Sequence, residues 1–263
     1  MSPSVNIIIP IYTEKSSFFE KKSIKQCVKI FGNRDITLVA PANLNLQNYL
    51  KIHPFKVETF DAEYFSNIQS YNQLLLSPAF YERFSAYSFI LIYQSDAFVF
   101  RDELEDWCRK NYDFIGAPVP EQAYEILYNE EILKNIHHVP AYIGNGGFSL
   151  RKIETFKQIT GTFKNDIEFL REHKINEDVI FCILLEKANM KLPGSNEAKY
   201  FSIDAFPKAT FESMNNHLPF GCHGWFKKDN TYYDDLFWLP LILPVTGYFY
   251  KLFFMIKYRC SKR

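Results

Sequence analysis

Residues 87–100 read Y-S-F-I-L-I-Y-Q-S-D-A-F-V-F and contain the pattern that decides the fold. The continuous apolar run at 89–93 is typical of a fully buried central strand of an α/β sheet. The run stops at Gln94-Ser95-Asp96, and a carboxylate at the carboxyl end of such a strand lies where open α/β sheets bind ligands. Asp96 is therefore a candidate site residue. A simple capping role, at a turn or at a helix beginning near Asp102, explains it equally well.

The segments around this strand predict a doubly wound sheet. Apolar strand patterns at 5–12, 36–40 and 57–60, with a helical pattern at 16–31, give the strand–helix–strand rhythm of a mostly parallel sheet flanked by helices. Further helices are predicted at 66–76, capped by Ser66, at 102–110 and at 176–187, and further strands at 112–118 and 200–203.

Composition limits the class of protein. A chain of 263 residues with 47% hydrophobic residues can bury one substantial core. Lys+Arg and Asp+Glu balance at 30 each, so no basic field indicates a nucleic-acid partner. Five scattered cysteines without a C-x-x-C pair favour neither a zinc site nor a disulfide framework, and they fit a reducing cytoplasm. We also expect no signal peptide, because the first residues lack a basic segment followed by an apolar one.

Three polar stretches are candidates for chemistry. Residues 144–151, G-N-G-G-F-S-L-R, let the backbone approach a ligand closely, or form only a tight turn into a strand. Residues 176–178, N-E-D, open a helix with two carboxylates, which either complement the helix dipole or hold a base at a cleft. His223 lies between turn residues in an aromatic loop, where it is either a ligand or an ordinary surface histidine.

The C-terminal tail has a different composition. Residues 236–256 are mostly apolar and aromatic, interrupted by Pro240, Pro244 and Gly247, and a basic end follows. This pattern favours an element in the membrane interface over a spanning helix. The alternative is a helix packed on the domain. We therefore expect a domain at 1–230 and an apolar, basic, membrane-associating tail at 231–263.

Taken together, Q-S-D-A, G-N-G-G-F-S-L-R, N-E-D-V-I-F and C-H-G-W resemble, in this order, bacterial glycosyltransferases of the GT-A fold. The nearest resemblance is to an uncharacterised, glycosyltransferase-like family of surface-polysaccharide gene clusters, and it covers residues 5–225. The resemblance implies a GT-A-like fold, a nucleotide-sugar donor and a divalent cation, Mn²⁺ or Mg²⁺, on the donor diphosphate.

The resemblance also implies residue roles. Asp178, with Glu177 beside it, would be the base of an inverting reaction, although retaining enzymes need none. Asp96 and His223 would hold the metal. The donor would contact Pro10, Ile11, Tyr12, Asn67, Tyr71, Asn72, Gln94, Ser95 and Asp96. The acceptor sugar would contact Asn145, Gly146, Gly147 and Trp225. Gln94 stands where the common motif has its first Asp, so metal affinity should be lower or the enzyme metal-independent.

The leading hypothesis is therefore transfer of a sugar, from UDP as the commonest carrier, to a glycan or lipid-linked acceptor in surface-polysaccharide synthesis. The tail would keep the enzyme at the cytoplasmic face of the cell membrane. A nucleotidyltransferase is disfavoured, because residues 7–15 provide no glycine-rich basic loop after the first strand. An inactive, membrane-attached glycan- or nucleotide-binding subunit is the non-enzyme alternative.

Overall fold

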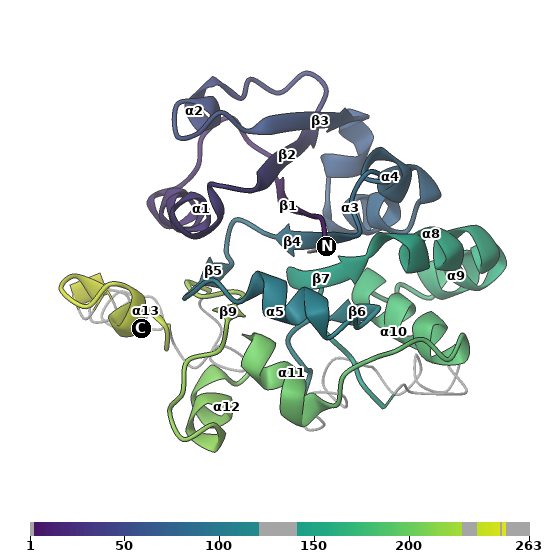
Figure 1. The fold of residues 1–263 in the computed structure, drawn as a ribbon. Helices are drawn as coiled ribbons and strands as arrows, with labels where there is room; N and C mark the ends of the chain where they lie inside the picture. Colours follow the sequence, from purple (N-terminus) through teal and green to yellow (C-terminus); the bar gives the residue numbers. More distant parts are fainter. Residues whose placement is uncertain (1–2, 121–140, 228–235, 248, 251–263) are drawn as a thin grey trace, which may run out of the picture.

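The computed structural model describes residues 3–120, 141–227, 236–247 and 249–250. Its main feature is a six-stranded sheet in the order β3-β2-β1-β4-β7-β6 (Figure 1). The strands are β1 (Val5–Pro10), β2 (Asp35–Pro41), β3 (Lys56–Phe60), β4 (Phe89–Tyr93), β6 (Phe114–Ile115) and β7 (Phe148–Lys152). Strands β1 to β4 are mutually parallel, whereas β7 runs antiparallel to both of its neighbours. The expected mostly parallel α/β sheet is confirmed.

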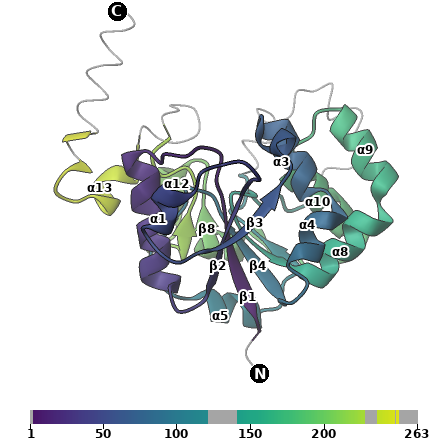
Figure 2. The same cartoon turned by 90° about the horizontal axis from the view of Figure 1, so that it is seen from above.

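Helices cover both faces of this sheet (Figure 2). Helix α1 (Phe18–Phe31) lies on one face. The opposite face carries α3 (Ile68–Leu75), α4 (Pro78–Arg83), α8 (Ile153–Thr162), α9 (Lys164–Glu172) and α10 (Glu177–Lys187). Burial on two faces explains why β4 is apolar throughout, since all five of its residues are at most 3% exposed. The remaining helices are α2 (Gln47–Leu50), η1 (Ala62–Phe65), α5 (Leu104–Arg109), α11 (Ser195–Phe201), α12 (Pro207–Ser213) and α13 (Leu239–Ile242).

A second, three-stranded sheet determines the position of the site. Strand β9 (Gly221–Cys222) lies between β5 (Phe98–Val99), to which it is antiparallel, and β8 (Ser202–Ile203), to which it is parallel. Asp96 comes just before β5, Asp204 directly after β8, and His223 directly after β9. Three segments far apart in sequence therefore deliver polar side chains to one place.

Three predicted elements differ from the structure. The helix expected from Ser66 begins at Ile68, and Asn67 is its N-cap, accepting a hydrogen bond from the Ser70 amide at 2.9 Å. The strand expected at 112–118 is only β6, because the Gly116 N–H and C=O both bond the Tyr142 hydroxyl and leave the ladder. The strand expected at 200–203 is only β8, since Tyr200 belongs to α11.

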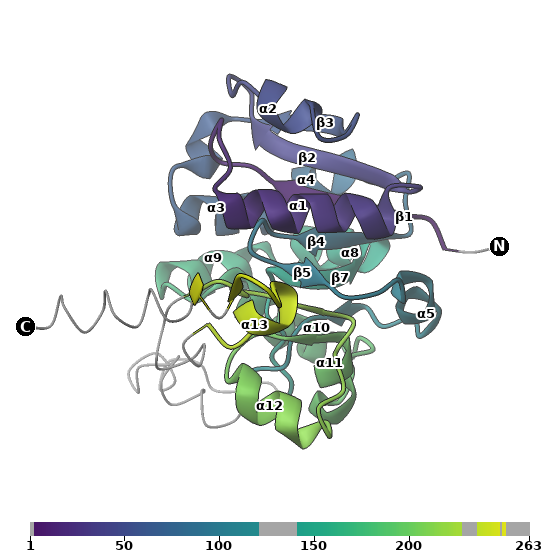
Figure 3. The same cartoon turned by 90° about the vertical axis from the view of Figure 1, so that its left-hand side faces the viewer.

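The tail lies partly within the described residues. Leu236, Trp238 and Leu239 are at most 4% exposed and belong to a second hydrophobic core with Phe98 and Trp225. Helix α13 lies on the same side of the main sheet as α1 (Figure 2), and at the level of β5 in Figure 3. Among the described helices none has the length and apolar character needed to cross a membrane. Residues 251–263, the basic end of the predicted tail, are outside the described residues.

Candidate functional site

A cavity of about 530 Å³ lies at the carboxyl ends of β1 and β4. Seven of the nine residues predicted to bind a donor line it, namely Tyr12, Asn67, Tyr71, Asn72, Gln94, Ser95 and Asp96. The other two, Pro10 and Ile11, are buried at the end of β1. The sequence-based prediction missed the other five residues that line the cavity, namely Glu20, Phe65, Ile68, Phe226 and Lys227. This volume is typical of a small-molecule site.

The cavity wall holds polar atoms that the protein does not satisfy. Within the described residues, the Tyr71 hydroxyl and the Asn72 amide nitrogen are buried without a hydrogen-bond partner. Such groups lose the solvation they have in water, so a ligand that bonds them gains affinity. The Tyr12 ring packs edge-on against the rings of Phe65 and Tyr71, with centroid distances of 5.9 Å and 5.5 Å. Tyr12 itself remains 40% exposed. The wall therefore combines aromatic surface with unpaired polar groups.

Asp96 and His223 meet directly at the edge of this cavity. The His223 Nε2 lies 3.0 Å from Asp96 Oδ1 and 3.0 Å from Gln94 Oε1, while its Nδ1 lies 2.9 Å from Asp204 Oδ1. The Lys227 ammonium lies 3.2 Å from the other Asp96 oxygen, Oδ2. Backbone hydrogen bonds fix this arrangement, because the amide of His223 bonds Ile203 O and that of Trp225 bonds Asp96 O. Asp204 and Lys227 were not predicted, and we call the four charged groups, without Gln94, the Asp96 cluster.

Two members of the cluster, Asp96 and His223, have pKa values that keep them charged at neutral pH. Burial alone would lower the pKa of His223, but the carboxylates of Asp96 and Asp204 act in the opposite direction and raise it to about 9. Burial alone would raise the pKa of Asp96, but His223 and Lys227 hold it well below its usual range. The histidine is therefore an imidazolium between two carboxylates.

These side chains do not fit the predicted divalent cation. A metal-binding histidine needs a free lone pair, and both ring nitrogens of His223 face carboxylate oxygens. Both oxygens of Asp96 are already bonded by cations. In the part of the chain that the structure describes, no group of three His, Cys, Asp or Glu side chains is placed to hold a metal ion. Asp96 and His223 thus form an ion pair in this structure.

The glycines at 146 and 147 separate the Asp96 cluster from a second group of charges. A Cβ added to Gly147 would collide with the His223 ring, and one added to Gly146 would lie 2.9 Å from Glu177 Oε2. The Gly146 amide donates to Asp178 Oδ2 at 3.1 Å, and the Gly147 amide donates to Asn145 Oδ1 at 2.8 Å. The glycines are therefore required first for close packing of the protein's own charged groups.

Asp178 and Glu177 have different surroundings. Burial raises the pKa of Asp178, opposed by hydrogen bonds from the amides of Gly146 and Val179, and the side chain remains partly exposed. A carboxylate with a raised pKa suits a general base. Glu177 is 4% exposed and pairs with the fully buried guanidinium of Arg151, which also bonds the Tyr81 hydroxyl at 3.0 Å. Burial raises the pKa of Glu177 to about 7 against the effect of Arg151. Glu177 thus belongs to the packed interior rather than to an open catalytic surface.

Trp225 requires a correction as an acceptor-binding residue. It is 0% exposed, its indole N–H donates to Ser23 Oγ at 2.7 Å, and its ring packs against Phe19 and Phe98. A buried indole with its only donor already bonded offers no surface to a sugar. Trp225 fixes the loop that carries His223 and Lys227.

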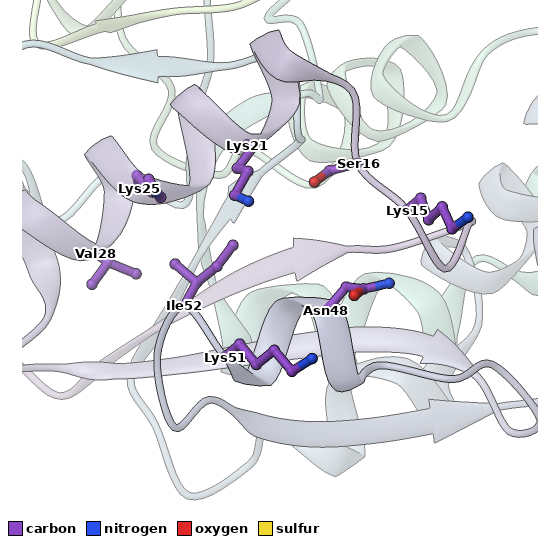
Figure 4. A pocket seen from close by; sticks show the side chains of 8 residues that line it. All are labelled: Lys15, Ser16, Lys21, Lys25, Val28, Asn48, Lys51 and Ile52. Carbon is purple, nitrogen blue, oxygen red and sulfur yellow. The ribbon is translucent and has the colours of Figure 1, made fainter.

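A second cavity of about 580 Å³ lies between α1 and the segment around α2 (Figure 4). Four lysines line it, Lys15, Lys21, Lys25 and Lys51, and none of them forms an ion pair with a described residue. The walls include no aromatic residue and no carboxylate. We assign the chemistry to the cavity at Asp96, because that one combines unpaired polar atoms, aromatic rings and fixed charges.

Comparison with known proteins gives a family and a fold. The model of a family described as "Protein of unknown function (DUF5672)" matches residues 54–223, which is more than half of the chain. The chain belongs to this family. In this DUF5672 chain the matched region contains Asp96, Asp178, Asp204 and His223 and ends before Lys227. No curated protein matches the sequence.

Solved structures show the fold of this DUF5672 chain. The galactosyltransferase LgtC, in complex with donor and acceptor sugar analogs, shares 13% identity over 83% of this chain and 86% of its own, with a TM-score of 0.53. Mouse xyloside xylosyltransferase 1, in its apo form, shares 10% identity over 84% of this chain and 97% of its own, also with a TM-score of 0.53. The GT-A glycosyltransferase fold expected from the sequence is thereby confirmed.

Proposed function

We propose that this chain is a glycosyltransferase that moves a sugar from a nucleoside-diphosphate donor, a UDP-sugar in the first instance, to a hydroxyl of a glycan or lipid-linked acceptor in bacterial surface-polysaccharide synthesis. The observation that carries the proposal is the cavity at the ends of β1 and β4. It gathers seven of the nine predicted donor residues, and the Tyr71 hydroxyl and the Asn72 amide nitrogen are buried in its wall. The GT-A fold supports the same reading by analogy.

The residues assign one chemical step. The acceptor hydroxyl attacks C1 of the donor sugar, the bond from C1 to the diphosphate oxygen breaks, and its electron pair leaves with the nucleoside diphosphate. Asp178 takes the hydroxyl proton, and the reaction inverts the anomeric centre. The carboxylate suits this role because it is held by the amides of Gly146 and Val179 and stays partly exposed. No divalent cation enters this proposal, because the ligands expected for it are bonded to each other.

The surface beside α1 favours a membrane as the place where the acceptor is met. Phe18, Val245 and Phe249 are 58%, 80% and 75% exposed, and the rings of Phe18 and Tyr250 lie 6.0 Å apart. The lysines of α1 are close by in sequence, and cations beside exposed aromatics suit an anionic lipid surface. We place the enzyme at the cytoplasmic face of the membrane, and sedimentation with anionic vesicles tests this placement.

The test of the function compares wild type with Asp178→Asn on a panel of UDP- and GDP-sugars. Binding is followed by thermal shift and turnover by release of the nucleoside diphosphate. We expect Asp178→Asn to bind the donor within about threefold of wild type and to lose about 10²–10⁴-fold in turnover, the range typical of a general base. Glu168→Gln, an exposed carboxylate on α9, is the matched control and should change neither quantity.

Three other results would decide against parts of the proposal. No thermal shift with any sugar nucleotide removes the donor-binding claim. Binding without turnover in wild type favours the inactive binding subunit. Unchanged turnover in Asp178→Asn removes the inverting base while leaving a transferase.

A further inference from the structure

Two side chains with nitrogen donors surround the Asp96 carboxylate. The His223 Nε2 lies 3.0 Å from Asp96 Oδ1, and its Nδ1 lies 2.9 Å from Asp204 Oδ1, so each ring nitrogen faces a carboxylate. The Lys227 ammonium lies 3.2 Å from Asp96 Oδ2 and is the second partner of that carboxylate. A buried carboxylate needs such partners, since an unpaired one is strongly destabilising.

Gln94 is consistent with this arrangement. Its amide oxygen lies 3.0 Å from His223 Nε2, beside the Asp96 oxygen that the same nitrogen contacts. An aspartate at this position would bring a third carboxylate to a cluster with two cations and would require another cation. The neutral amide makes that additional cation unnecessary.

Of the two cations, only Lys227 reaches the cavity. Its side chain is 38% exposed and lines the cavity together with Asp96, whereas the His223 side chain is 5% exposed and does not line it. A lysine ammonium is a compact point charge that binds phosphate groups well. Asp96 holds this ammonium by an ion pair, and both residues line the cavity that Tyr71 and Asn72 also line.

We propose that Lys227, positioned by Asp96, is the cation that binds the diphosphate of the donor, in place of a divalent metal ion. The inference rests on the proposed function in taking a sugar nucleotide as the ligand. In the transfer step the ammonium stabilises the negative charge that develops on the leaving diphosphate, as preorganised cations do in phosphate sites. His223 and Asp204 act through Asp96 and are positioning residues.

The experiment measures binding of UDP, GDP and ADP to the full chain by calorimetry, once in EDTA and once with Mn²⁺. We expect one nucleotide to bind in EDTA, with an affinity that Mn²⁺ changes less than about twofold. Lys227→Met should weaken this binding by about 10–100-fold, the loss expected for one charge-assisted hydrogen bond to a phosphate. Lys227→Arg should retain most of the affinity because it keeps the charge. Lys51→Met, which removes a lysine from the other cavity, is the matched control and should bind as wild type.

Each result that contradicts the inference leads to a different conclusion. Binding that requires Mn²⁺ overturns this inference and leaves the proposed function standing. Binding in EDTA that Lys227→Met does not weaken, or that Lys51→Met weakens equally, overturns the role of Lys227. Failure of all three nucleotides to bind wild type under both conditions overturns the inference and the proposed function together. Lys227→Met removes one of the two partners of the Asp96 carboxylate, so it should melt at a lower temperature than wild type, and a single cooperative thermal transition confirms that it is folded.

Discussion

Two groups of buried charges lie on either side of Gly146 and Gly147, and they differ in what they leave accessible. In the pair of Arg151 and Glu177, the side chains are 0% and 5% exposed, and the rings of Phe114, Phe156 and Phe181 surround the guanidinium. In the Asp96 cluster, one member, Lys227, opens into a cavity. The comparison distinguishes buried charges that stabilise the fold from charges that are accessible to a ligand. Removing a partner should affect stability most in the first group and binding most in the second.

The largest expected effect on stability comes from the closed pair. Arg151→Met leaves Glu177 buried without its cation and should lower the free energy of unfolding by about 3–5 kcal/mol, measured by urea denaturation. The matched control is Lys187→Met, which breaks the exposed pair of Lys187 and Asp166 and should cost less than about 1 kcal/mol. The double variant Arg151→Met with Glu177→Met should recover much of the loss. A single variant as stable as wild type would contradict the distinction between the two groups.

The Asp96 cluster should make stability depend on pH in the alkaline direction. His223 has its pKa raised from 6.5 to about 9 in the folded protein, so its contribution is fully present below pH 6.5 and is lost as pH rises through 9. The free energy of unfolding should therefore fall by up to about 3 kcal/mol across this window. Urea denaturation at pH 6, 7.5 and 9 measures the fall, and the difference from His223→Gln isolates the histidine.

The variant Asp204→Asn tests whether the pKa of His223 causes this pH dependence of the free energy of unfolding. It removes one of the two carboxylates that raise the pKa of His223, so the decline should again begin near pH 6.5 but should be smaller and should end at lower pH than in wild type. Equal pH profiles for wild type, His223→Gln and Asp204→Asn would show that the cluster contributes nothing to alkaline stability.

The smallest expected effect concerns the glycines between the two groups. Gly147→Ala places a methyl group against the His223 ring and should destabilise the protein by about 2 kcal/mol, as overpacking does. Gly161→Ala in α8 is the control, because nothing lies within 4 Å of its added Cβ, and it should stabilise by up to about 1 kcal/mol. Thermal melting distinguishes the two. A neutral Gly147→Ala would mean that the His223 ring moves aside.

The sequence allowed the main sheet to be predicted wherever burial on two faces produces an unbroken apolar run. Strand β4 has the bounds of the apolar run at 89–93, and β1 and β2 likewise coincide with apolar runs in the sequence. The two-residue strands β6 and β8 could not be delimited, because so short a strand is set by its neighbours rather than by its own pattern. Helices α8 and α9, between the glycine stretch and α10, were not predicted at all.

The candidate site was predictable where polar residues follow an apolar strand, as at Asp96. Asp204 follows β8 in the same way, but a strand of two residues gives too weak a signal to single it out. Arg151 was given no role from the sequence, yet it is fully buried, and three aromatic rings and Glu177 enclose it. Lys227 lies beyond the motifs, and long-range contacts such as the hydrogen bond from Trp225 N to Asp96 O bring its segment to the cavity.

The small sheet β5-β9-β8 also determines when, during synthesis, the site comes into being. Domains fold as their chain emerges, beginning with the N-terminal part. Strands β1 to β4 and their crossover helices are made first and provide the aromatic wall of the cavity together with Asp96. His223 is 129 positions later than Gln94, its contact across the cluster, and Lys227 is later still. A nascent chain thus has most of its main sheet well before residues 221–227 complete the Asp96 cluster, and the proposed binding of a sugar nucleotide would report that this late segment has docked.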